Sequence, residues 1–338
     1  MAFIEKEKIE YELSVEGERV QLRKYLLRML AFIAMVLVIG FVSVFIPDLG
    51  NKEHMLYALR DKHAALDSLS GNGPKVILVG GSNLAFGMDS KMVSEELGMP
   101  VVNMAVHAAL GLKFMLDDSR PFVEKGDIVV IVPEYPHFYD TYPSTFYGAD
   151  ELLTVVLDVL PGEVSYISAK QWTHLYRYLP KYIGNKYYGL VKFRNGRKFT
   201  GKGAAYRRAT YNKFGDNEGH LDMKSYPAVV PPHVDHDVDQ DVVDYLNDYQ
   251  AFCESKEAKT FFSYTVIQDT GFYRTIKHIE KLEPKLEEEL NMPILAPASK
   301  LRLPERLFFD SQEHLNKEGR ELRTKMFIED LKKKLDRE

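Results

Sequence analysis

The most constraining feature of this sequence is a short run of β-forming residues that ends abruptly at two glycines and a serine. Val76–Val79 is entirely apolar, and Gly80, Gly81 and Ser82 follow it directly. A short apolar run closed by turn residues is typical of a buried parallel strand. Because open α/β sheets bind ligands beyond the carboxyl ends of their strands, we expect Ser82 to lie at a functional edge.

A nucleophilic serine needs a base to take its proton and donors to hold the oxyanion that forms. The candidate base is His314, and the candidate acid that orients it is Asp310, both in the loop before the last predicted helix. In a doubly wound sheet this loop reaches the same carboxyl edge as Ser82. A purely structural role stays open for each of the three residues. Ser82 can be a small residue in a tight turn, His314 a surface histidine and Asp310 the cap of a turn.

Two segments together carry a resemblance to a known family. The turn Gly81–Asn83 resembles the first sequence block of the SGNH (GDSL-like) hydrolase superfamily, and Asp310–Asn316 resembles its last block. The resemblance covers roughly Pro74 to the end of the chain. It implies a catalytic triad of Ser82, His314 and Asp310, and acyl-transfer chemistry without a cofactor.

The resemblance also implies an oxyanion hole, and here the sequence departs from the family pattern. Backbone N–H groups near Asn83 and at Gly111 are the expected donors. The asparagine of the third block is missing, and Glu134 follows the third strand instead. Asn103 and Glu134 are candidate substrate-binding residues, although a loop-fixing amide and a polar strand end are the simpler interpretations. Asp310 also precedes the histidine by four residues, where the family has three.

The order of predicted elements indicates an α/β fold. Helical stretches alternate with the first three of five short β-rich runs, which favours right-handed crossovers and a parallel sheet. We therefore predict a flavodoxin-like, doubly wound, five-stranded parallel sheet, which is also the SGNH hydrolase fold. The five runs are Lys75–Val79, Pro100–Met104, Asp127–Val132, Lys259–Val266 and Pro293–Ala296.

The N-terminal region predicts a membrane anchor. Met29–Ile46 contains no charged residue, which is long enough for one membrane-spanning helix. A cleaved signal peptide fits poorly because a polar tail precedes the run, and a buried soluble helix is the remaining alternative. Basic residues crowd the N-terminal flank, so the positive-inside rule puts the N-terminus in the cytoplasm and the remainder outside, in the periplasm or at the cell surface.

These observations define the predicted organisation of the chain. We predict a cytoplasmic tail (1–24), a transmembrane helix (25–46), a membrane-proximal helix and linker (47–73) and an SGNH-like domain (74–338) with a large insertion at about 139–249. The insertion is rich in glycine, proline and aromatic residues, and we expect it to cap the site.

Composition excludes some kinds of partner and some kinds of site. The net charge of −5 does not suggest a nucleic-acid binder, and the single cysteine, Cys253, excludes a disulfide within the chain. His233–Asp239 is rich in His and Asp, but its spacing matches no standard metal site, so we interpret it as an exposed polar loop and predict no metal.

Two functional hypotheses follow. The first is a membrane-anchored serine esterase or O-acyltransferase that acts on acyl esters, with acetyl preferred, of cell-envelope polysaccharide or of a lipid-linked acceptor. By resemblance, its expected partner in the bilayer is a multi-pass membrane acyltransferase. The second is a non-catalytic envelope binding or assembly protein of the same fold, which the missing asparagine and the shifted Asp310 favour.

Overall fold

The structure, a computed structural model, describes residues 2–46, 52–139, 146–194, 200–226 and 237–336. The chain divides into two compact units, Met1–Pro47 and Asp48–Glu338. We describe each of them separately.

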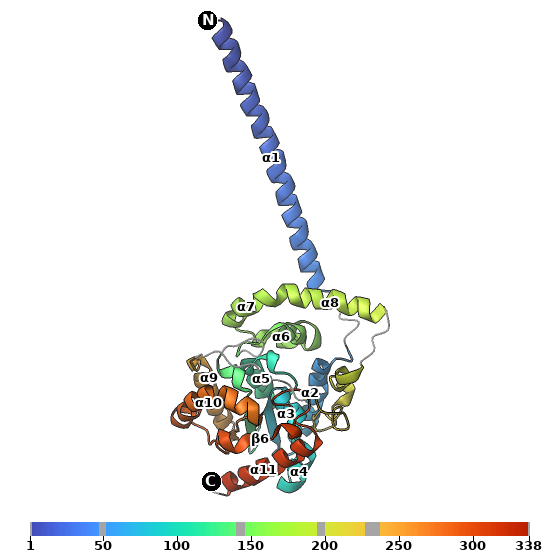
Figure 1. Cartoon of the computed structure of the whole chain (residues 1–338), viewed down its shortest axis with the longest axis vertical. Coiled ribbons are helices and arrows are strands. Elements are labelled where there is room, and N and C mark those ends of the chain that lie inside the picture. The colour runs from blue at the N-terminus through green and yellow to red at the C-terminus, as the bar shows by residue number, and fades with distance from the viewer. Residues whose placement is uncertain (1, 47–51, 140–145, 195–199, 227–236, 337–338) are drawn as a thin grey trace. The chain divides into compact units, whose positions relative to one another are not determined.

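The N-terminal unit is one long helix, α1 (Ala2–Val44), seen at the blue end of Figure 1. Its stretch Glu16–Val44 is long and apolar enough to span a membrane. Large apolar side chains are exposed along it, Leu37 by 67% and Phe41 by 68%. Such exposure is unfavourable in water and suits a lipid environment. From Ala2 to Val44 the predicted tail and the predicted spanning segment therefore form a single continuous helix.

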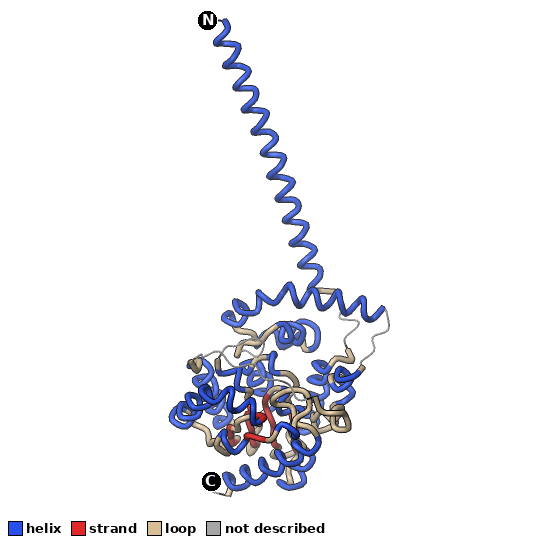
Figure 2. The backbone as a smooth tube through the Cα atoms, viewed as in Figure 1, coloured by secondary structure: helices blue, strands red, loops and turns tan. Residues whose placement is uncertain are grey.

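The second unit is built on a parallel sheet of four strands, drawn in red in Figure 2. The order is β2-β1-β3-β4, and the strands are β1 (Val76–Gly80), β2 (Val101–Asn103), β3 (Ile128–Val132) and β4 (Lys259–Phe262). The first three strands are buried along their whole length. Burial on both faces explains their continuous apolar sequences.

The direction of the chain through the sheet reverses next to β1. The chain moves outward from β1 to β2 and then crosses back to β3. Right-handed crossovers therefore put α4 (Ser90–Leu97) and α5 (Leu112–Ser119) on opposite faces of the sheet. Helix α4 packs against α11 (Lys317–Leu335), and α5 packs against α9 (Gln240–Ser255). The carboxyl ends of β1 and β3 thus form the switch point of the sheet.

The prediction of a fifth strand in this sheet is wrong. The segment Pro293–Ala296 makes only one isolated parallel bridge, from Ile294 to Phe262 of β4. Proline lacks the N–H that a strand ladder needs, and Pro293 and Pro297 flank the bridge. A separate two-stranded parallel sheet is formed by β5 (Ile267–Gln268) and β6 (Arg302–Leu303).

Local capping signals fix where two of the helices begin and where one of them ends. Helix α4 begins after Asp89, whose side chain accepts from Met92 N, and ends at Gly98, which has a positive φ of 66°. Helix α11 begins after Asn316, whose side chain accepts from Gly319 N. The remaining helices of the sheet region are α2 (Ala58–Leu69), α3 (Ser82–Gly87) and α10 (Asp269–Glu289).

The insertion between β3 and β4 is mainly helical in its described residues. It contains α6 (Asp150–Thr154), α7 (Ala169–Leu175) and α8 (Leu179–Arg194). Helix α9 packs against β4 and is the crossover helix of that strand, so the insertion ends before α9. Short 3-10 or π turns lie at Met55–Tyr57, Ala108–Leu110, Arg120–Phe122, Tyr135–Phe138, Val155–Val159, Pro161–Tyr166, Tyr176–Tyr178, Gly201–Ala205, Arg208–Thr210, Ala298–Leu301 and Glu305–Leu307.

Candidate active site

Ser82 is the first residue of α3, immediately beyond the carboxyl end of β1. Gly81 is its extended N-cap residue, and Ser82 is 8% exposed. A side chain at position 81 would collide with its surroundings, because a Cβ there would lie 2.6 Å from Glu134 Oε1. The same Cβ would lie 3.0 Å from Ala108 Cα, so a larger residue at position 81 would displace the Glu134 carboxyl group and press on the backbone at Ala108.

His314 is held by a short pinned loop before α11. Phe308 and Phe309 are fully buried, and Phe309 N donates to His314 O at 2.8 Å. Leu315 forms a bridge with Phe308 and is also fully buried. These contacts, together with the Asn316 cap, fix both ends of the loop that carries the imidazole.

Ser82, His314 and Asp310 form a continuous hydrogen-bonded chain. Ser82 Oγ lies 2.9 Å from His314 Nε2, and His314 Nδ1 lies 2.8 Å from Asp310 Oδ1. Burial acts to raise the pKa of Asp310, but hydrogen bonds from His314 and Tyr206 outweigh it and hold this pKa below its usual value. An ionised acid on Nδ1 leaves Nε2 free to accept the serine proton, which is the arrangement that a serine nucleophile needs.

Two aromatic residues hold the histidine and its acid. Tyr206 donates to Asp310 Oδ2 at 2.7 Å, and its hydroxyl lies 3.3 Å from His314 Nδ1. Phe86 stacks on the imidazole, with ring centroids 4.4 Å apart and an interplanar angle of 12°. The sequence analysis missed both residues. Tyr206 comes from the insertion, which therefore contributes directly to this site.

The two backbone N–H groups predicted as oxyanion donors already form hydrogen bonds within the chain. Asn83 N donates to Glu134 Oε1 at 3.1 Å, and Gly111 N donates to Ala108 O at 3.0 Å. The Ser82 N–H, at the start of α3, has no hydrogen-bond partner among the described residues. It is consequently the backbone group best placed to hold an oxyanion.

The two candidate substrate-binding residues have different surroundings. Asn103 is fully buried, and its side chain donates to Leu84 O and to Asp216 Oδ1 and accepts from Ala105 N. Its amide is thus used to fix the loop after β2. Glu134, by contrast, is 6% exposed and lies 3.2 Å from Ser82 Oγ through Oε1.

The Glu313 side chain forms no hydrogen bond with His314 or Asp310 in the described part of the chain. It is 5% exposed and is a close neighbour of Glu134. Burial and the negative charge of Glu134 raise the pKa of Glu313 well above its usual range. Asp310 is therefore the carboxylate that orients the imidazole in the described part of the chain, through its contact with His314 Nδ1.

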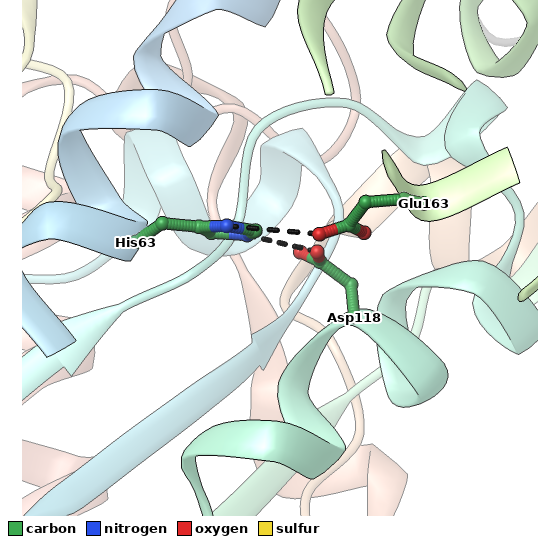
Figure 3. Close-up of side chains that lie close together, drawn as sticks. All are labelled: His63, Asp118 and Glu163. Atoms are coloured by element: carbon green, nitrogen blue, oxygen red, sulfur yellow. Dashed lines mark hydrogen bonds and ion pairs between the residues drawn. The ribbon is translucent and has the colours of Figure 1, made fainter. Parts of the chain in front are cut away.

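A second cluster lies elsewhere in the domain and could hold a metal ion. Figure 3 shows His63 of α2, Asp118 of α5 and Glu163 pointing toward one another, with ligand atoms that all lie within 4.8 Å. His63 Nε2 is 2.8 Å from Asp118 Oδ1. Burial and a hydrogen bond with Asp118 raise the pKa of Glu163 to about 10. A proton on Glu163 can therefore link the two carboxyl groups without a metal ion. The sequence analysis missed it because its residues come from three separate elements.

The remaining predicted features and the comparisons add no further site. Most of His233–Asp239, interpreted above as an exposed loop, lies outside the described residues. A comparison with models of protein families finds no match, and a comparison with curated proteins finds none either. The function is therefore argued from the geometry of the site.

Proposed function

We propose that this chain is an SGNH-like serine esterase or O-acyltransferase. The hydrogen-bonded chain from Asp310 through His314 to Ser82 is the observation that carries this proposal. All three residues come from the carboxyl edge of the sheet, where doubly wound proteins bind their ligands. The resemblance of the two flanking sequence blocks to the SGNH superfamily points to the same chemistry.

The reaction follows from the positions of the polar atoms. His314 Nε2 takes the proton of Ser82 Oγ as the oxygen attacks the acyl carbonyl, and Asp310 stabilises the imidazolium that forms. The carbonyl oxygen becomes negative near the Ser82 N–H. The carbon–oxygen bond to the leaving alcohol then breaks, and the alcohol takes the proton from His314. Water or a sugar hydroxyl attacks the acyl-serine by the same steps in reverse.

The apolar α1 suggests where this chemistry takes place. The basic flank of the helix favours a cytoplasmic N-terminus and an extracytoplasmic domain. Acyl esters of a cell-envelope polysaccharide or of a lipid-linked acceptor are the substrates that a tethered domain meets at this surface. A multi-pass acyltransferase in the same membrane is the partner that would supply acyl groups.

One observation favours the second candidate function, a non-catalytic envelope binding or assembly protein. The N–H groups of Asn83 and Gly111 are both hydrogen-bonded to other atoms of the chain. Only the Ser82 N–H remains for an oxyanion among the three backbone groups considered, and hydrolases commonly use more than one donor.

Hydrolysis of p-nitrophenyl acetate by the full chain in detergent separates the two functions. The Ser82→Ala and His314→Ala variants should each lower kcat/KM by about three orders of magnitude or more. Wild-type turnover equal to that of both variants would favour the binding function.

A further inference from the structure

The part of the insertion that contains α8 is strongly basic. The stretch 164–215 holds twelve Lys and Arg residues and no Asp or Glu, although the net charge of the whole chain is −5. The same stretch holds eight tyrosines and Trp172, the single tryptophan of the chain. Basic and aromatic residues together are typical of a surface that contacts anionic lipid headgroups.

Polar contacts on the inner side of α8 fix its orientation in the second unit. Tyr182 is 1% exposed and donates to Asp158 Oδ2 at 2.8 Å. Lys186 is 4% exposed, and its Nζ lies 2.9 Å from Asp158 Oδ1. Asp158 belongs to the turn that follows α6, and α8 packs against α6 (Figure 1). These contacts determine which side of α8 points outward.

The outward side of α8 is aromatic and apolar. Its exposed large side chains are Tyr187, Tyr188 and Val191, which are 44%, 62% and 58% exposed. Val191 follows the two tyrosines by four and three residues, which puts all three on one side of the helix. A surface helix of a soluble domain normally turns charged side chains to water and apolar ones to the core. Helix α8 does the reverse, because the Lys186 ammonium is buried and these three side chains are exposed.

The anchor helix keeps this side within reach of a membrane. Only ten residues join Val44, the end of α1, to Met55, which begins the first helical turn of the second unit. A fully extended chain of that length spans at most ~40 Å. A tether this short makes weak surface contacts effective, because binding becomes intramolecular. Among anionic partners, the lipid surface is therefore the one that the second unit always meets.

We propose that the outward side of α8, formed by Tyr187, Tyr188 and Val191, docks on the anionic surface of the bilayer that α1 crosses. The tyrosine rings lie at the level of the headgroups, where an apolar ring and a polar hydroxyl both find suitable surroundings. Arg177 and Lys181, exposed on the same segment, add attraction to lipid phosphates. This docking does not depend on the chemistry at Ser82.

Fluorescence quenching in vesicles tests the docking with the full chain. The native Cys253 is fully buried, so an introduced cysteine can be labelled selectively with an NBD maleimide. Tyr188→Cys carries the probe on α8, and the vesicles contain phosphatidylcholine and phosphatidylglycerol, with or without brominated lipid. Tyr273→Cys on α10 is the matched control, because Tyr273 is also 62% exposed. Leu37→Cys reports on the apolar part of α1.

Brominated lipid should quench the probe at position 188 several-fold more strongly than the probe at position 273, and it should quench the probe at position 37 most strongly. Raised salt, or vesicles of phosphatidylcholine alone, should weaken the quenching at position 188 and leave that at position 37 unchanged, because only the surface contact is electrostatic. Tyr187→Glu should weaken the quenching of a probe on Val191→Cys, whereas Tyr273→Glu should not.

The contrary outcomes are distinct from one another. Equal quenching at positions 188 and 273, with strong quenching at position 37, would overturn the docking and leave the anchor intact. A blue shift at position 188 that grows with protein concentration, without quenching by brominated lipid, would assign this side of α8 to a second copy of the chain and overturn the docking. A probe at position 37 that is not quenched would overturn both the docking and the spanning α1. Each result is independent of turnover at Ser82, so the docking can fail while the proposed function stands.

Discussion

Replacing Asp310 by asparagine is the most informative single change in the triad. The Asp310 carboxylate accepts from His314 Nδ1 at 2.8 Å, which leaves Nε2 unprotonated and facing Ser82 Oγ at 2.9 Å. An asparagine of the same shape can donate its amide to Nδ1. The imidazole proton then moves to Nε2, and the ring can no longer take the proton of the serine.

The contacts of Asp310 set the size of the expected loss. The wrong tautomer lowers the rate by about 10⁴-fold in serine hydrolases, or about 5 kcal/mol of transition-state stabilisation. Tyr206 Oη lies 3.3 Å from His314 Nδ1 and can accept a hydrogen bond from its N–H. This contact favours the tautomer that carries the proton on Nδ1. We therefore expect a loss of about 10³- to 10⁴-fold in kcat for Asp310→Asn alone, and the full loss when Tyr206→Phe is added.

The assay is kcat/KM for p-nitrophenyl acetate, with thermal unfolding measured in parallel. Asp222→Asn is the matched control, because the Asp222 side chain is 94% exposed and lies 3.8 Å from Nζ of Lys317, the first residue of α11. It should leave the rate unchanged. An Asp310→Asn variant that is folded and keeps more than about a tenth of the wild-type rate would refute the assignment of Asp310 as the orienting acid.

Three further predictions concern the surroundings of the triad and the anchor. Tyr206→Phe removes the 2.7 Å hydrogen bond to Asp310 and should lower kcat/KM by about tenfold, measured with the same ester; an unchanged rate would contradict it. Gly81→Ala puts a methyl group 2.6 Å from Glu134 Oε1 and 3.0 Å from Ala108 Cα and should slow fluorophosphonate labelling, whereas Gly162→Ala, in open space, should not. In right-side-out vesicles, Asp67→Cys should react with an impermeant maleimide and Glu18→Cys should not; the reverse pattern would invert the predicted topology.

Some of the fold could be predicted because its signals are local. Helix α4 begins and ends where its sequence signals lie, because Asp89 and Gly98 cap its two ends. The parallel arrangement of β1 to β4 follows from alternating apolar runs and helices. The fifth strand could not be predicted from apolar residues alone, since the prolines at 293 and 297 limit its pairing to one bridge.

The candidate site shows the same division between local and distant information. Asp310 and His314 lie in one short loop before the last helix, so the sequence alone could suggest that the two side chains meet. Tyr206 joins them from 104 residues away, within an insertion that has no clear periodicity. The surroundings of Glu134 also depend on tertiary contacts. The sequence indicated neither the burial of the Glu134 side chain nor its position 3.2 Å from Ser82 Oγ.

The most direct test of the account is covalent labelling of Ser82. The purified full chain is treated with a fluorophosphonate, and the modified peptide is identified by mass spectrometry, with His314→Ala as the comparison. The account predicts a single adduct on Ser82 of the wild type and labelling slower by about three orders of magnitude in the variant. Labelling at another residue, or equal labelling of Ser82 in both proteins, would contradict a nucleophile activated by His314.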